Sequence, residues 1–84
     1  MDKTTIYTSQ YCPYCIKALD LLNAKGVTYT NISIDSHPDI RVEMTKKAGS
    51  HTVPQIWIGE THVGGCDELY ALEHKGQLDR LLKS

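Results

Sequence analysis

The chain has 84 residues, and its hydrophobic fraction of 40% is enough for one domain with a modest core. Nine basic and ten acidic residues give a formal charge of −1, which favours neither nucleic acid nor an anionic membrane as a partner. No apolar run approaches the roughly 18 residues that span a bilayer. We expect a single domain over residues 1–84, without a secretory segment, that is monomeric and meets a small soluble substrate in a reducing cytoplasm.

The first half of the chain predicts a strand, a helix and a second strand. Residues 4–8 are rich in β-branched side chains and predict the first strand. Residues 16–25 predict a helix that ends at Gly26, and its apolar face is expected to comprise Cys15, Ala18, Leu19 and Leu22. Residues 27–34 show an alternating pattern rich in β-branched side chains and predict the second strand. A helix connects the two strands, so we expect them to be parallel.

A second helix is expected from about residue 38 to residue 47. Ser36 or His37 stands near its N-cap, Pro38 comes early and Gly49 lies beyond its end. Its buried side is expected to comprise Ile40, Met44 and Ala48.

The last third of the chain predicts a hairpin and two helices. Residues 55–58 and 61–63 flank Gly59-Glu60 at hairpin spacing. Gly64-Gly65 permits a turn into a helix over about residues 66–75, with Leu69 and Leu72 inward, and a short helix follows over residues 78–83. The order β-α-β-α-β-β-α-α predicts an α/β protein with a four-stranded mixed sheet flanked by helices.

Cys12-Pro13-Tyr14-Cys15, between the first strand and the first helix, is a candidate dithiol redox site. With Pro13 at the first helical position, Cys12 becomes the N-cap, facing the N–H groups of Tyr14 and Cys15 and the positive end of the helix dipole. These features favour thiolate over thiol. Cys15 lies one turn further along the helix, within reach of a disulfide after a small adjustment.

Two other interpretations of the cysteines are open. A closed zinc site needs four ligands, and Cys66 with His37, His51, His62 and His74 supplies no second ligand pair at zinc-like spacing. A purely structural disulfide suits a small secreted chain, but three cysteines are an odd number.

Three motifs in this order, Cys12-Pro13-Tyr14-Cys15, Thr52-Val53-Pro54 and Gly64-Gly65-Cys66-Asp67, resemble the dithiol glutaredoxins, particularly the bacterial ones. The resemblance covers nearly the whole chain and implies a thioredoxin-like fold. It implies a glutathione-dependent oxidoreductase that uses Cys12 and Cys15 to reduce protein disulfides and protein–glutathione mixed disulfides. Glutathione is then the reductant, and no metal is expected.

The resemblance also implies a set of glutathione-binding residues. They are Tyr14, Arg41, Thr52, Val53, Pro54, Gly65, Cys66 and Asp67. The residues alone predict a trans Pro54, whereas the resemblance implies a cis bond that turns the Val53 backbone toward the sulfurs. The N-terminus of the third helix and Asp67 suit the γ-glutamyl carboxylate and ammonium. Two alternatives are a helix cap for Asp67 and a small buried hydrophobe for Cys66.

The chain departs from the family three residues before Cys12. Dithiol glutaredoxins usually carry a lysine there, where this chain has Ser9. The resemblance implies that Arg41 then holds the glycine carboxylate of glutathione, with Lys17 a weaker candidate; the alternative for Arg41 is a solvated helix face. His51 is either a source of pH-dependent charge near the site or an ordinary loop residue. Two functional alternatives are a thioredoxin-like donor recycled by a flavoprotein reductase and an iron–sulfur carrier bridged by glutathione.

Overall fold

The computed structural model describes residues 3–35 and 37–83. The elements are β1 (Thr4–Thr8), α1 (Pro13–Ala24), β2 (Tyr29–Ser33), α2 (Pro38–Ala48), β3 (Gln55–Ile58), β4 (Thr61–Gly64), α3 (Cys66–His74) and α4 (Leu78–Lys83). Their order is the one that the sequence predicts.

The four strands form one mixed sheet in the order β2-β1-β3-β4. β1 is parallel to β2 and antiparallel to β3, and β3 is antiparallel to β4. The edge strand β2 is shorter than the predicted 27–34, because its parallel register begins with Tyr29 opposite Thr4, the first residue of β1. Val27 and Thr28 therefore precede the ladder.

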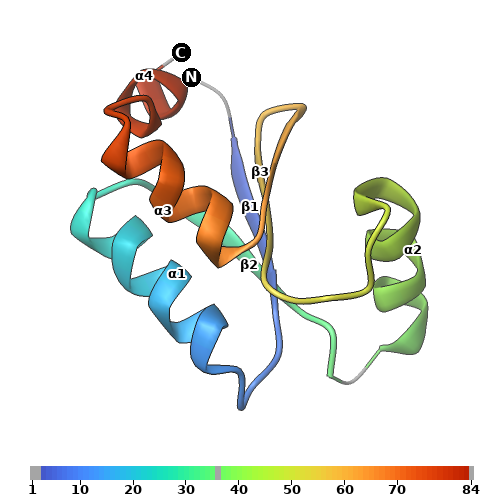
Figure 1. The fold of residues 1–84 in the computed structure, drawn as a ribbon. Helices are drawn as coiled ribbons and strands as arrows, with labels where there is room; N and C mark the ends of the chain where they lie inside the picture. Colours follow the sequence, from blue (N-terminus) through green and yellow to red (C-terminus); the bar gives the residue numbers. More distant parts are fainter. Residues whose placement is uncertain (1–2, 36, 84) are drawn as a thin grey trace.

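Helices cover the two faces of the sheet unequally. α1 and α3 lie on one face and α2 lies on the other (Figure 1). The main core lies under α1 and α3 and contains Ile6, Leu22, Ile56, Leu69 and Leu78, each at most 1% exposed. Burying each of these side chains contributes roughly 1.5–3 kcal/mol. A smaller core of Tyr7, Ile34 and Met44 lies on the α2 side.

The buried faces of the helices differ in part from the prediction. In α1, Leu21 is buried in the main core that α1 shares with the sheet, α3 and α4, whereas Leu19 packs against that core and is only half-buried. In α2 only Met44 is buried, while Ile40 and Ala48 are half-buried. Leu69 of α3 is buried as predicted, and Leu72 is half-buried against the main core.

The ends of the helices follow local signals. α2 has His37 as its N-cap and Pro38 at its first position, while the alternative N-cap, Ser36, lies outside the described residues. Gly49 ends α2 in the left-handed region at φ 72°, a conformation that favours glycine. α3 ends at His74, one residue before the predicted end.

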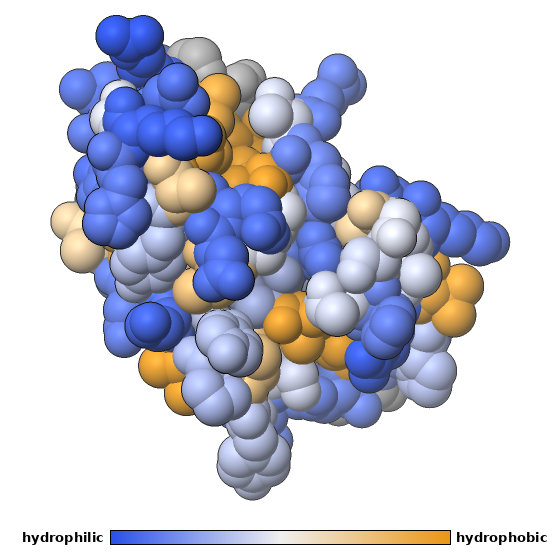
Figure 2. All heavy atoms as spheres, viewed as in Figure 1, coloured by the Kyte–Doolittle hydropathy of each residue, from blue (hydrophilic) through white to orange (hydrophobic). Residues whose placement is uncertain are grey.

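Within residues 3–35 and 37–83, no helix combines the length and the hydrophobicity of a membrane span. Figure 2 shows hydrophilic residues over most of the visible face, with hydrophobic residues in separate small groups.

Candidate active site

Three loops meet at the end of the sheet opposite the chain termini. They are the β1–α1 loop, the segment before β3 and the entry to α3, and they approach one another near the N-terminus of α1 (Figure 1). These loops carry the three motifs that the sequence singled out. The fold therefore brings together residues that lie more than 50 positions apart, such as Tyr14 and Asp67.

Cys12 is the N-cap of α1, as predicted. Its backbone is extended (φ −101°, ψ 111°), and Pro13 occupies the first turn. The Cys15 N–H donates to Cys12 Sγ at 3.3 Å, and the Cys12 thiol donates to the Val53 carbonyl at 3.7 Å. Of the two N–H groups expected at this sulfur, that of Cys15 makes the contact. The sulfur of the half-buried Cys12 thus sits between a helix N-terminus and the Val53 carbonyl.

Cys15 lies one turn deeper and is 1% exposed. Burial, followed by the hydrogen bond with Cys12 and the charge of Cys12, raises the pKa of Cys15 to about 12. Cys15 is therefore a neutral thiol at pH 7, shielded by the helix. Neither cysteine is in a disulfide in this structure.

This difference in access predicts which cysteine iodoacetamide modifies. In the reduced protein we expect Cys12 to react first, because Cys15 and Cys66 are buried and burial raises the pKa of both of their thiols. Mass spectrometry of the alkylated peptides at pH 7 identifies the site. Faster labelling of Cys15 or Cys66 would contradict the assignment of Cys12 as the nucleophile.

The Val53–Pro54 peptide bond is cis, as the resemblance implies and as the residues alone do not predict. A buried side chain anchors the preceding residue: Gln55 Nε2 donates to the Thr52 carbonyl at 3.0 Å and to Thr52 Oγ1 at 3.2 Å. The Gln55 amide oxygen in turn lies 2.8 Å from His62 Nε2. Sequence analysis missed Gln55 and His62, although a glutamine that begins an otherwise apolar strand was a usable signal.

A hollow of about 180 Å³ lies close to Cys12: its lining includes Tyr14 of the dithiol motif and Val53, whose carbonyl accepts a hydrogen bond from the Cys12 thiol. It is lined by seven of the eight predicted glutathione-binding residues, all except Arg41, and by Glu68. The lining residues are Tyr14, Thr52, Val53, Pro54, Gly65, Cys66, Asp67 and Glu68. The structure therefore gathers most of the predicted set around one small space, which we call the thiol-side hollow.

The N-terminus of α3 forms one wall of the thiol-side hollow. Glu68 Oε1 accepts a hydrogen bond from the Gly65 N–H at 2.7 Å, so Glu68, and not Asp67, provides the side-chain cap. A Cβ on Gly65 would lie 3.3 Å from the Pro54 carbonyl oxygen, which explains the glycine. The Asp67 carboxylate is exposed at the hollow, and the N–H groups of Cys66 and Asp67 lie in the first turn, where a helix offers them no intrahelical acceptor.

Cys66 is 6% exposed and packs in the main core. Burial raises the pKa of its thiol. A shielded neutral thiol is a poor nucleophile, so the structure favours the interpretation of Cys66 as a small buried hydrophobe.

The cations that the sequence proposed lie apart from this hollow. Arg41 Nη2 donates to the His51 carbonyl at 3.1 Å, and the Lys17 ammonium lies 5.8 Å from the centroid of the Tyr70 ring. Arg41 is exposed on α2. Its bond to the His51 carbonyl holds its side chain near the loop that leads to Thr52.

Ser9, at the position where the family carries lysine, is bound to an acidic residue that sequence analysis missed. Ser9 Oγ donates to Asp35 Oδ1 at 2.6 Å, and the Gln10 N–H donates to Asp35 Oδ2 at 2.7 Å. These bonds lower the pKa of Asp35, and the charge of Arg41 acts in the same direction. Asp35 is therefore a carboxylate at neutral pH.

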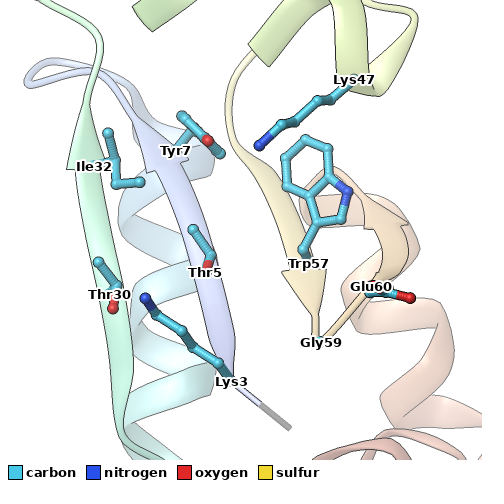
Figure 3. Close-up of a pocket in the computed structure, with 9 residues that line it drawn as sticks. All are labelled: Lys3, Thr5, Tyr7, Thr30, Ile32, Lys47, Trp57, Gly59 and Glu60. Atoms are coloured by element: carbon cyan, nitrogen blue, oxygen red, sulfur yellow. The ribbon is translucent and has the colours of Figure 1, made fainter. Parts of the chain in front are cut away.

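A larger hollow of about 460 Å³ lies on the α2 side of the sheet (Figure 3). Its wall includes Trp57, whose ring meets the Tyr7 ring edge-on with the two ring centroids 5.4 Å apart. The Trp57 ring also stacks on the His62 ring, with the centroids 4.7 Å apart. No cysteine lines it. Trp57 and Tyr7 thus pack against each other in the smaller core on the α2 side.

The zinc interpretation requires a set of neighbouring ligands. Across residues 3–35 and 37–83, no three His, Cys, Asp or Glu side chains are grouped so that they could hold a metal ion.

Comparison with known proteins agrees with this geometry. A dithiol at the N-terminus of α1, beside a cis-proline segment on a β2-β1-β3-β4 sheet, defines a thiol-disulfide oxidoreductase of the thioredoxin superfamily. Residues 4–63 match the family model for glutaredoxin. The chain belongs to the glutaredoxin family.

The relatives match along their whole length. The chain is 58% identical over 84 residues to a glutaredoxin of Pseudomonas aeruginosa, covering 100% of both proteins. It is 51% identical over 83 residues to glutaredoxin 3 of Escherichia coli strain K12, covering 99% of this chain and 100% of that protein.

Solved structures show the same fold. The solution structure of a glutaredoxin from Brucella melitensis matches with a TM-score of 0.89 and 51% identity, over 99% of this chain and 90% of that one. The crystal structure of a buckwheat glutaredoxin–glutathione complex matches with a TM-score of 0.90 and 29% identity, over 98% of this chain and 77% of that one.

Proposed function

We propose that this protein is a glutathione-dependent oxidoreductase that reduces protein–glutathione mixed disulfides and protein disulfides. The observation that supports the proposal is the thiol-side hollow, which is lined by seven residues of the predicted glutathione set, among them Val53, whose carbonyl accepts a hydrogen bond from the Cys12 thiol. The buckwheat relative, which shares the fold, was crystallised with glutathione. We further propose that the protein works as a monomer in a reducing cytoplasm, where its thiols persist.

The proposed binding mode assigns each part of glutathione to a group of the hollow. The N–H groups of Cys66 and Asp67 hold the γ-glutamyl carboxylate, and the Asp67 carboxylate holds the ammonium. The Val53 backbone pairs with the backbone of the cysteinyl residue, as in strand addition. Arg41, held near the Thr52 loop by the His51 carbonyl, attracts the glycine carboxylate.

Reduction of a mixed disulfide needs only Cys12. Its thiolate attacks the glutathione sulfur, the target protein leaves as a thiolate, and glutathione remains bound to Cys12 through a disulfide. The thiolate of a second glutathione then attacks that glutathione sulfur. Oxidised glutathione leaves, and the Cys12 thiolate is restored.

Reduction of a protein disulfide uses both cysteines. Cys12 attacks one sulfur of the substrate and forms a mixed disulfide, and the second substrate sulfur leaves as a thiolate. Cys15 loses its proton and attacks the Cys12 sulfur, which releases the substrate fully reduced. The resulting Cys12–Cys15 disulfide takes two electrons from two glutathione molecules, which leave as oxidised glutathione.

A coupled assay tests the proposal directly. The protein is given a small glutathione mixed disulfide with glutathione, glutathione reductase and NADPH, and NADPH oxidation is followed. A parallel assay replaces the glutathione system with a flavoprotein thioredoxin reductase. Turnover with glutathione supports the proposal, whereas turnover only with the flavoprotein would favour the thioredoxin-like alternative.

The proposed role of Arg41 gives a quantitative prediction. Arg41→Ala should raise the KM for glutathione a few-fold, because an exposed ion pair contributes about 0.2–1 kcal/mol. Ser9→Lys should lower this KM and partly rescue Arg41→Ala, although the new ammonium also meets Asp35. Steady-state kinetics of the double-mutant cycle, at low and high salt, measure the coupling. Strict additivity would show that other groups hold the carboxylate.

A further inference from the structure

Asp35 connects the end of β2 to the loop that leads to Cys12. One carboxylate oxygen accepts a hydrogen bond from the Ser9 hydroxyl at 2.6 Å, and the other accepts one from the Gln10 N–H at 2.7 Å. Both donors lie two or three residues before Cys12. The carboxylate is thus fixed next to the loop that carries the nucleophile, although Asp35 itself is exposed.

The charge of Asp35 reaches Cys15. It is one of the causes that raise the pKa of Cys15, one helical turn beyond Cys12. Ser9 is neutral, so the residue bound to Oδ1 brings no positive charge to offset that of the carboxylate. Arg41 acts electrostatically on Asp35, but its guanidinium is also hydrogen-bonded to the His51 carbonyl.

We propose that Asp35 is a specificity-determining residue of the redox site. Tethered by Ser9 and Gln10, its carboxylate disfavours the approach of anionic reaction partners to Cys12. Two consequences follow: a neutral electrophile has an advantage over an otherwise similar anionic one, and Asp35 weakens the hold on the glycine carboxylate of glutathione. The second consequence rests on the proposed function, whereas the first does not.

A pair of alkylating reagents isolates the charge effect. Iodoacetamide is neutral and iodoacetate is anionic, and both consume the same Cys12 thiolate, so the ratio of their rate constants is independent of the thiolate fraction. Asp35→Asn keeps a side-chain oxygen acceptor and removes the charge. We expect it to raise the iodoacetate-to-iodoacetamide rate ratio at Cys12 a few-fold at low salt, up to about five-fold. The gain should vanish near 1 M salt, where the Debye length is about 3 Å.

Three further variants separate charge from structure. Glu60→Gln removes one negative charge at the β3–β4 turn, at the far end of the sheet (Figure 1), and should leave the ratio unchanged. Ser9→Ala removes one hydrogen bond but keeps the Asp35 charge, so it should not raise the ratio. Ser9→Lys leaves Asp35 intact and should raise the ratio as Asp35→Asn does.

The outcomes test the role of Asp35 and the proposed glutathione-dependent function separately. An unchanged ratio in Asp35→Asn at low salt would overturn the inference, whatever Ser9→Lys does, and so would an equal rise in Glu60→Gln. In the coupled assay, Asp35→Asn should lower the KM for glutathione a few-fold with little change in kcat. If the protein failed to use glutathione at all, the proposed function would fail, and the alkylation ratio would still decide the role of Asp35.

Discussion

Cys15→Ser is expected to keep the reduction of glutathione mixed disulfides and to lose the reduction of protein disulfides. The first cycle returns the Cys12 thiolate with glutathione alone, whereas the second needs an intramolecular thiol to release the substrate. Cys12→Ser should abolish both activities, because Cys12 is the sulfur at the helix N-terminus and the more accessible one. Assays with a small mixed disulfide and with a protein disulfide measure the two cycles separately.

The third cysteine supplies the matched control. Cys66→Ala removes a buried thiol that packs in the main core, and it should keep both cycles with a lower melting temperature. If Cys15→Ser abolished the mixed-disulfide cycle as fully as Cys12→Ser, the division of roles would be wrong. Loss of either cycle in folded Cys66→Ala would give Cys66 a redox role.

Asp67→Ala is expected to raise the KM for glutathione about ten-fold. The charge-assisted bond proposed between Asp67 and the glutathione ammonium contributes about 1.5 kcal/mol or more, and ten-fold corresponds to about 1.4 kcal/mol. Because Glu68 caps α3, the fold should lose little stability when Asp67 is truncated. Steady-state kinetics and a thermal melt measure the two effects on the same preparation.

Glu68→Ala is the neighbouring comparison. It removes the bond to the Gly65 N–H and should lower the free energy of unfolding by about 1 kcal/mol, with a smaller change in KM than Asp67→Ala causes. If Asp67→Ala lowered the melting temperature and left the KM for glutathione unchanged, Asp67 would stabilise the N-terminus of α3 and would not bind glutathione.

Local signals account for what the sequence predicted well. Pro13 after Cys12 predicts where α1 begins, and Gly49 predicts where α2 ends, because each depends on backbone preferences of adjacent residues. The thiol-side hollow was predicted in a different way, since its three walls were identified from motifs of a known family. The residues alone favoured a trans Pro54.

The features that sequence analysis missed depend on contacts between distant segments. Asp35 meets Gln10 across 25 positions, and no local pattern marks that pairing. The start of β2 depends on its register with Thr4, and the burial of Leu21 depends on the core that α1 shares with the sheet, α3 and α4. The capping role of Glu68 could have been predicted from the sequence, because Glu68 lies three residues after the N-cap Gly65, the spacing of a capping box.

The protonation of Cys15 depends on the state of the Cys12 sulfur. While Cys12 is a free thiolate, its charge and its hydrogen bond are among the causes that keep the pKa of Cys15 high. When the Cys12 sulfur enters a mixed disulfide in the proposed mechanism, it loses its charge, so these two causes disappear, while burial and the smaller effect of the Asp35 charge remain. Cys15 then gives up its proton more readily, at the moment when there is a disulfide for it to attack. In the proposed mechanism the first reaction thus promotes the second, and the Cys15 thiol stays protonated until the mixed disulfide has formed.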